Sequence, residues 1–134
     1  MKSLLGFLVA CALSSTAWGQ ADWRKFDDSA AAANYTDLAR VQRDHYGVQT
    51  FRAWWLTSYK TAKMHKGARY DDTVALYRVD CLSAGLTLLQ ITGRDAKGGP
   101  VWLGDGGRER IALPDSIGEN FLTTVCNHAK DARL

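Results

Sequence analysis

Three cysteines constrain this chain more than any other feature of its 134 residues. Cys11 lies in an N-terminal apolar run that resembles an export signal, so removal of that run would leave Cys81 and Cys126 as a single pair. In a small exported domain such a pair indicates a disulfide bond, which would close a loop of about 46 residues and stabilise the fold by on the order of 4 kcal/mol. The competing interpretation, a reactive thiol or metal pair, lacks a CxxC spacing and neighbouring histidines.

The N-terminal run has the three parts of a secretory signal. Lys2 provides the positive charge, and residues 4–13 form an apolar segment that is too short to span a bilayer as a helix. Small residues then precede Gln20, which we expect to be the mature N-terminus. The prediction is a signal peptide over residues 1–19 and one mature domain over residues 20–134.

Two alternatives to this cleavage site stay open. Cleavage after Ala17 or after Ala21 also fits the small-residue pattern. Leu8-Val9-Ala10-Cys11 matches a bacterial lipobox, but lipidation at Cys11 would leave only about seven apolar residues before the cut. Simple secretion to the periplasm or the cell surface is therefore favoured over a lipid anchor.

Charge and composition narrow the class of partner. Removal of Lys2 lowers the formal net charge from +3 to +2, because no other charged residue lies in the signal. The basic residues are scattered along the chain, which argues against a nucleic-acid surface. No second apolar run is long enough to span a membrane, and a 46% hydrophobic content supports one compact core.

Most of the mature sequence has the alternating pattern of β-strands. We expect strands at 23–26, 34–37, 48–59, 73–82, 85–94, 101–103 and 111–113. Segment 48–59 carries aromatics on both faces and should be a central strand. Residues 60–69 are polar and basic without a clear period, so they are expected to form an irregular connection.

A single helix should follow the strands. Pro114 ends the extended part, and Ser116 with Glu119 three residues later forms a capping box. Apolar residues then recur at helical spacing, and Cys126 lies on that stripe, towards the strand face that presents Cys81. The predicted fold class is α+β: a curved antiparallel sheet of about six strands, with one C-terminal helix packed on a face and tethered by the disulfide.

No catalytic constellation is visible in the sequence. His45, His65 and His128 are scattered and lack a neighbouring nucleophile and acid. The acidic pairs 27–28 and 71–72 are typical of solvated strand ends rather than of a calcium loop. The glycine-rich stretches do not lead from a strand into a helix, so a phosphate loop is excluded. We expect no catalytic residues, no metal site and no cofactor.

A binding surface is the better prediction. Trp54 and Trp55 are adjacent in one strand and must point to opposite faces, and Arg52 shares the face of Trp54. These three residues are the candidate binding residues. One helix covers only one face, so a tryptophan on the other face requires sheet curvature, a loop, a protein ligand or self-association.

Several short segments, in a characteristic order and spacing, point to a known family. They are Trp23, Tyr35-Thr36-Asp37, Arg52-Ala53-Trp54-Trp55, Tyr59-Lys60, Val79-Asp80-Cys81, Pro114-Asp115-Ser116-Ile117-Gly118-Glu119 and Val125-Cys126. Through them the mature chain resembles the surface-adhesin protein E-like domain of Gram-negative bacteria. That resemblance implies an antiparallel sheet with a C-terminal helix tethered to it by the two cysteines.

The founding type of that family is a surface lipoprotein that binds host matrix proteins, whereas most relatives have no assigned role. The predicted function is therefore an exported, non-enzymatic, envelope- or surface-associated binding domain of adhesin-like character. The alternatives are a small periplasmic enzyme and an accessory or inhibitor protein that covers a partner.

Overall fold

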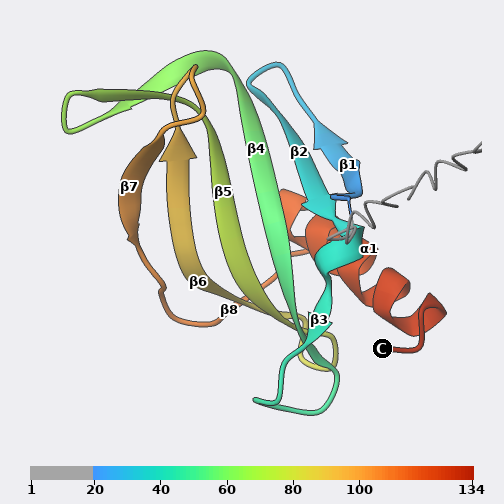
Figure 1. The fold of residues 1–134 in the computed structure, drawn as a ribbon. Helices are drawn as coiled ribbons and strands as arrows, with labels where there is room; N and C mark the ends of the chain where they lie inside the picture. The colour runs from blue at the N-terminus through green and yellow to red at the C-terminus, as the bar shows by residue number, and fades with distance from the viewer. Residues whose placement is uncertain (1–19) are drawn as a thin grey trace, which may run out of the picture.

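The computed structural model describes residues 20–134. The expected signal, its cleavage before Gln20 and the lipobox at Cys11 lie outside the described residues and stay predictions. Figure 1 shows an open, curved sheet with a single helix on one side of it. This arrangement confirms the predicted fold class.

Every strand pairing in the sheet is antiparallel. The elements are β1 (Trp23–Asp28), β2 (Ala32–Asp37), η1 (Leu38–Arg40), β3 (Gln42–Arg43), β4 (Thr50–His65), β5 (Ala68–Asp80), β6 (Gly85–Arg94), β7 (Pro100–Asp105), β8 (Arg110–Ile111) and α1 (Ile117–Asp131). The main path of six strands runs β1-β2-β4-β5-β6-β7, while the short β3 pairs with β4 and β8 pairs with β6. The consecutive strands β6 and β7 form an antiparallel hairpin.

The curvature of the sheet has local causes in its register. Pairing shifts occur between Lys25 and Asp27, between Leu76 and Tyr77, and at one position each in β4 and β6. Each shift inserts extra residues into one strand, which bends that strand and increases its twist. The sheet can therefore wrap partly around α1.

The core lies between α1 and one face of the sheet. Its fully buried members are Phe51, Ala53, Val79, Phe121 and Val125. The Phe121 ring from α1 lies 4.8 Å from the Trp55 ring, and Phe26 and Tyr77 pack around the same pair. This aromatic cluster anchors the helix to the central strands.

The start of α1 follows the predicted capping box. The Ser116 hydroxyl accepts a hydrogen bond from the Glu119 N–H at 3.1 Å. The Glu119 carboxylate reaches back and accepts from the Asp115 N–H at 2.6 Å. The Ser116 hydroxyl thereby satisfies one backbone donor that the helix leaves unpaired, and the Glu119 carboxylate pairs the N–H of the residue before the N-cap. The negative charge of Glu119 also stabilises the positive end of the helix dipole.

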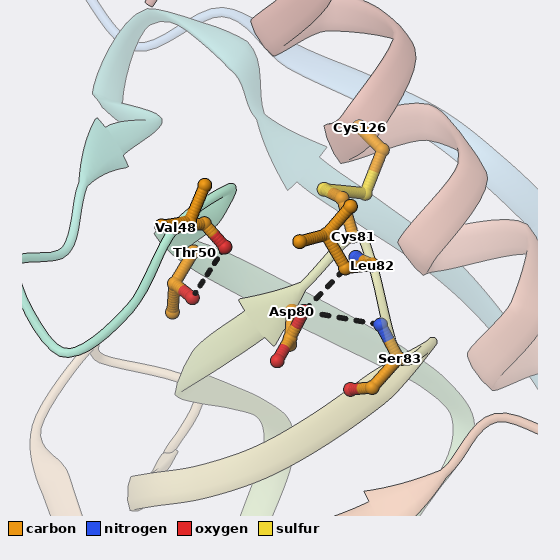
Figure 2. The surroundings of a disulfide bond; sticks show 7 residues. All are labelled: Val48, Thr50, Asp80, Cys81, Leu82, Ser83 and Cys126. Carbon is orange, nitrogen blue, oxygen red and sulfur yellow. Dashed lines mark hydrogen bonds between the residues drawn. A yellow bond between two sulfur atoms is a disulfide. The ribbon is translucent and has the colours of Figure 1, made fainter.

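The disulfide between Cys81 and Cys126 is present, with a Cα–Cα distance of 5.9 Å. Figure 2 shows the bond running from the end of β5 to α1, while the Asp80 side chain next to it takes a different direction. The Asp80 carboxylate accepts the N–H groups of Leu82 and Ser83 at 2.9 and 3.1 Å. It thereby shapes the turn that follows the cysteine.

The prediction of an irregular connection over residues 60–69 was wrong. β4 continues to His65, β5 begins at Ala68, and a two-residue turn joins them. Both turn residues, Lys66 and Gly67, have positive φ angles of 48° and 80°, as a tight hairpin turn requires. Pairing of β4 with β2 ends at Tyr59, so the tip of the β4–β5 hairpin projects beyond the neighbouring strands. Because neither side of the tip packs against a core, its sequence lacks the alternation of apolar and polar residues that indicates a strand.

Candidate binding surface

The side of the sheet that faces away from α1 has no helix over it. We define the open face by the central residues Arg52, Trp54 and Leu56 of β4 and Val74, Leu76 and Arg78 of β5. The register places Arg52 opposite Arg78, Trp54 opposite Leu76 and Leu56 opposite Val74. Directly paired residues in antiparallel strands share a face, so all six lie together.

One row of this face runs across the sheet from β2 to β7. From Leu56 and Val74 the cross-strand pairs continue to Tyr35 on β2 and to Thr92 and Trp102 on β6 and β7. Trp102 is 60% exposed, whereas the central apolar residues are partly buried by their neighbours. The open face therefore presents a band of mostly aromatic and aliphatic side chains, in which Thr92 lies between Val74 and Trp102.

A buried carboxylate holds one end of this face. Asp44, which follows β3, is only 7% exposed. Its Oδ2 accepts from the Nε of Arg52 at 3.1 Å and from the Nε of Arg78 at 3.0 Å. Its Oδ1 accepts from the Tyr46 N–H at 2.9 Å, which forms a local Asx-type turn. One acid thus links the β3–β4 loop to two strands.

The electrostatics of this cluster keep Asp44 ionised. Burial by itself raises the pKa of Asp44, but the Tyr46 N–H and the guanidinium groups of Arg78 and Arg52 outweigh it. Together they lower the pKa of Asp44 from 3.8 to about 2. The carboxylate is therefore charged throughout the physiological pH range.

The three sequence-predicted binding residues are not all brought together. Arg52 and Trp54 lie on the open face, as their shared spacing indicated. Trp55 lies on the opposite side, packed against Phe121 and Tyr77. Its indole N–H donates to Asn34 Oδ1 at 2.8 Å, so both its ring and its polar group are engaged within the domain.

The remaining candidate groups lie apart from one another. His45 follows β3 and His65 ends β4, so they are at opposite ends of the longest strand, and His128 lies in the last turn of α1. Within residues 20–134 no group of three or more potential metal ligands is found. The acidic pairs serve in ion pairs: Asp72 binds Arg94 through both oxygens, at 2.6 and 3.0 Å.

The comparison with protein families decides the classification. The profile of the family described as "Surface-adhesin protein E" matches residues 23–127, which is most of the chain. The chain belongs to the surface-adhesin protein E family. The resemblance expected from the sequence is thereby confirmed. As a member of this family, the chain is an exported, cell-surface protein of adhesin-like binding character.

Solved structures agree with the family at the level of the fold. A structure of Haemophilus influenzae protein E has a TM-score of 0.61 at 13% identity, covering 81% of this chain and 96% of that one. Protein E from non-typeable Haemophilus influenzae gives 0.59 at 12% identity, covering 83% and 88%. A second crystal form of Haemophilus influenzae protein E gives 0.60 at 12% identity, covering 76% and 91%. A search of curated protein sequences found no match.

For this adhesin E family member, sequence reasoning missed three of the four residues in the cluster around Asp44. Asp44, Tyr46 and Arg78 were not among the candidate residues. A local signal for Asp44 does exist, because an aspartate two residues before a turn residue is typical of an Asx-turn. Its pairing with Arg78, 34 positions away, depends on strand register and has no local signal.

In the part of the chain that the structure describes, no helix is long and apolar enough to cross a membrane.

Proposed function

We propose that this chain is a non-enzymatic surface domain that binds a protein ligand through the open face. The observation that carries the proposal is the band of aromatic and aliphatic side chains on the side of the sheet away from α1. Aromatic residues and arginine are enriched at the centres of protein interfaces, and contiguous apolar surface on a folded domain marks contact sites. The family assignment supports a binding role over a catalytic one.

The direct test is binding to immobilised extracellular-matrix extract, measured by biolayer interferometry with residues 20–134. Trp54→Ser should reduce binding strongly, because tryptophans at interface centres contribute most of the binding energy. Leu82→Ser is the matched control, since Leu82 is 72% exposed in the turn after β5 and lies outside the open face. Equal binding by the Trp54→Ser variant and the unchanged domain would contradict the proposal.

Self-association is a second use of the same surface. A face with an apolar band can be covered by another copy of the chain as well as by a different protein. Sedimentation velocity over a range of concentrations distinguishes the two cases. A dimer that dissociates on Trp54→Ser substitution would support self-association, and a monomer at all concentrations would exclude it.

The absence of catalysis is part of the proposal and has its own test. His45 and His65 lie at opposite ends of β4, so they do not support each other in one acid–base site. A broad hydrolase screen should show no turnover that depends on a histidine. Turnover that disappears on replacing His45, His65 or His128 by alanine would favour the small periplasmic enzyme.

We also infer that residues 1–19 form a cleaved export signal and that residues 20–134 are the mature domain. The intact mass of protein recovered from the cell envelope should correspond to a chain that begins at Gln20. A mass that begins at Cys11 and includes acyl chains would show that the lipobox is used instead.

A further inference from the structure

Two arginines lie directly side by side on the open face. Arg52 of β4 and Arg78 of β5 are paired residues in the antiparallel register, so their side chains leave the sheet at neighbouring points. Like charges at directly paired positions destabilise a sheet. Asp44 offsets part of that repulsion, but one carboxylate balances only one of the two guanidinium charges. The cluster therefore keeps an excess of one positive charge.

The bonding pattern holds both guanidinium groups in fixed positions. Each arginine contacts the same Asp44 oxygen through its Nε, and the other Asp44 oxygen is occupied by the Tyr46 N–H. The Asp44 N–H in turn donates to the Thr50 carbonyl at 2.8 Å, so the acid itself is held by the β3–β4 pairing. The Arg78 guanidinium also lies over the Tyr46 ring, 4.2 Å from the ring centroid, in a cation–π contact.

The outer ends of the two guanidinium groups are available to a ligand. Within residues 20–134, the hydrogen bonds of Arg52 and Arg78 use only Nε, so the terminal Nη groups have no protein acceptor. The Arg52 side chain is 49% exposed and that of Arg78 is 20% exposed. A pocket of about 370 Å³ lies on the β3 side of Arg52, lined by Gln42, Arg43, Asp44, His45 and Arg52, and Arg78 is not part of its lining. An incoming group thus has donors on both arginines and open space beside Arg52.

We propose that Arg52 and Arg78 form a receptor for one carboxylate, presented by an aspartate or glutamate side chain of a protein ligand. The planar N–H pair of a guanidinium matches the two oxygens of a carboxylate, and fixing the donors in advance reduces the entropy lost on binding. The site takes a single acidic group because Arg94, also on this side of the sheet, is already neutralised by Asp72. A polyanionic chain would require a row of uncompensated cations.

The apolar neighbours indicate a protein as the source of the carboxylate. Trp54 and Leu76 are the next directly paired residues along the same two strands, so an acidic side chain bound at the arginines would have apolar groups next to it. A protein surface provides both kinds of contact. The identity of this occupant rests on the proposed protein-binding function, whereas the recognition of a carboxylate by the two arginines does not.

The test follows the arginine Nε–H signals by NMR during titration with a capped Gly-Glu-Gly peptide, with Gly-Gln-Gly as the uncharged control. The glutamate peptide should shift the Arg52 and Arg78 signals, and the glutamine peptide should leave them unchanged. Arg52→Gln should weaken binding about tenfold through loss of charge-assisted hydrogen bonds. Arg94→Gln is the matched control and should retain binding. Equal shifts with both peptides, or unchanged binding by Arg52→Gln, would overturn the proposal.

The Asp44→Asn variant tests whether binding depends on the fixed positions of the guanidinium donors or only on the net positive charge of the site. This substitution removes the negative charge of Asp44, so the net charge of the site rises by one. It also weakens the contacts that hold both guanidinium groups, so we expect weaker binding of the glutamate peptide. Tighter binding would show that net charge alone attracts the anion and would overturn the account. Because this variant risks misfolding, the Arg52→Gln result, at an exposed position, decides the proposal where Asp44→Asn does not fold.

Two competition experiments identify which kind of molecule supplies the anion. A sulfated heparin oligosaccharide that displaces the glutamate peptide at lower concentration would reassign the site to a glycan and contradict the protein carboxylate. Inorganic phosphate should compete only weakly. If the unchanged domain binds the glutamate peptide but not the matrix extract, the proposed function is contradicted and the carboxylate receptor is not. If it binds the matrix extract but not the glutamate peptide, only the carboxylate receptor is contradicted.

Discussion

The two faces of the sheet differ in burial and in what covers them, although the same strands form both. On the helix side, Phe51, Val79 and Phe121 are fully buried, and a disulfide holds the cover in place. On the open face, Trp54 and Leu76 are only partly buried, and the charged groups are arranged around a single buried acid. The difference indicates that α1 stabilises the domain, and it supports the proposal that the open face makes contacts outside the domain.

The largest effect is expected from the centre of the covered face. Phe121 is fully buried and contacts three other aromatic rings. Phe121→Ala should lower the free energy of unfolding by about 3–5 kcal/mol, because it removes apolar contacts and leaves a cavity. Denaturant unfolding measures this change. Ile117→Ala, on the same helix but at a 42% exposed position, should cost under about 1 kcal/mol. A comparable loss at both positions would show that α1 has no distinct buried stripe.

The disulfide should have the next largest effect. Cys81 and Cys126 are 45 positions apart, and removing the bond by a double substitution to alanine should cost about 2–4 kcal/mol. The expected loss comes chiefly from the larger conformational freedom of the unfolded chain. Thermal unfolding of the oxidised domain and of the double variant gives the difference. Identical melting temperatures would mean that the aromatic cluster alone fixes the helix.

The effect of Asp44 should be smaller and should depend on pH. The pKa of Asp44 is about 2 in the folded domain against an ordinary 3.8. A lowered pKa stabilises the fold above the unfolded value, and that contribution is lost as the pH falls from 3.8 towards 2. We expect at most about 2 kcal/mol, and about 1 kcal/mol once solvent screening at the half-exposed Arg52 is counted.

The measurement for this acid dependence is urea unfolding as a function of pH. Asp44→Asn should be less stable at neutral pH and should lose stability less steeply on acidification than the unchanged domain. Asp28→Asn is the control, because the pKa of Asp28 is also lowered, chiefly by its hydrogen bond to Lys25, but its side chain is exposed. A steep acid dependence that persists in Asp44→Asn would place the responsible carboxylate elsewhere.

The covered face was largely predictable from the sequence. Alternation along residues 48–59 and 73–82 placed Phe51, Ala53 and Trp55 on one side, and the capping box fixed the helix start at Ser116. These signals are local, since each depends on residues a few positions apart. The disulfide followed from the cysteine count and from the helical stripe that carries Cys126.

The polar cluster of the open face was not predictable in the same way. Continuing the register of the hairpin tip, where His65 pairs with Ala68, would set Arg52 opposite Cys81 rather than Arg78. The register shift between Ser58 and Lys63 places Arg52 opposite Arg78 instead. Most of this shift lies within residues 60–69, whose pattern indicated no strand. Because the tip projects beyond its neighbours, its sequence carries no apolar period from which the shift can be read.

The most direct test of the division between the two faces compares Trp54→Ser with Trp55→Ser, adjacent substitutions of the same kind. Each variant is measured for its free energy of unfolding and for its binding to immobilised matrix extract. Trp55→Ser should lose at least about 3 kcal/mol of stability, because it opens the aromatic core and removes the hydrogen bond to Asn34. Trp54→Ser should remain folded, with a smaller loss of stability, and should lose most of its binding. Equal losses of stability at both positions, in a domain that sediments as a monomer, would mean that both faces are ordinary core and would contradict the account.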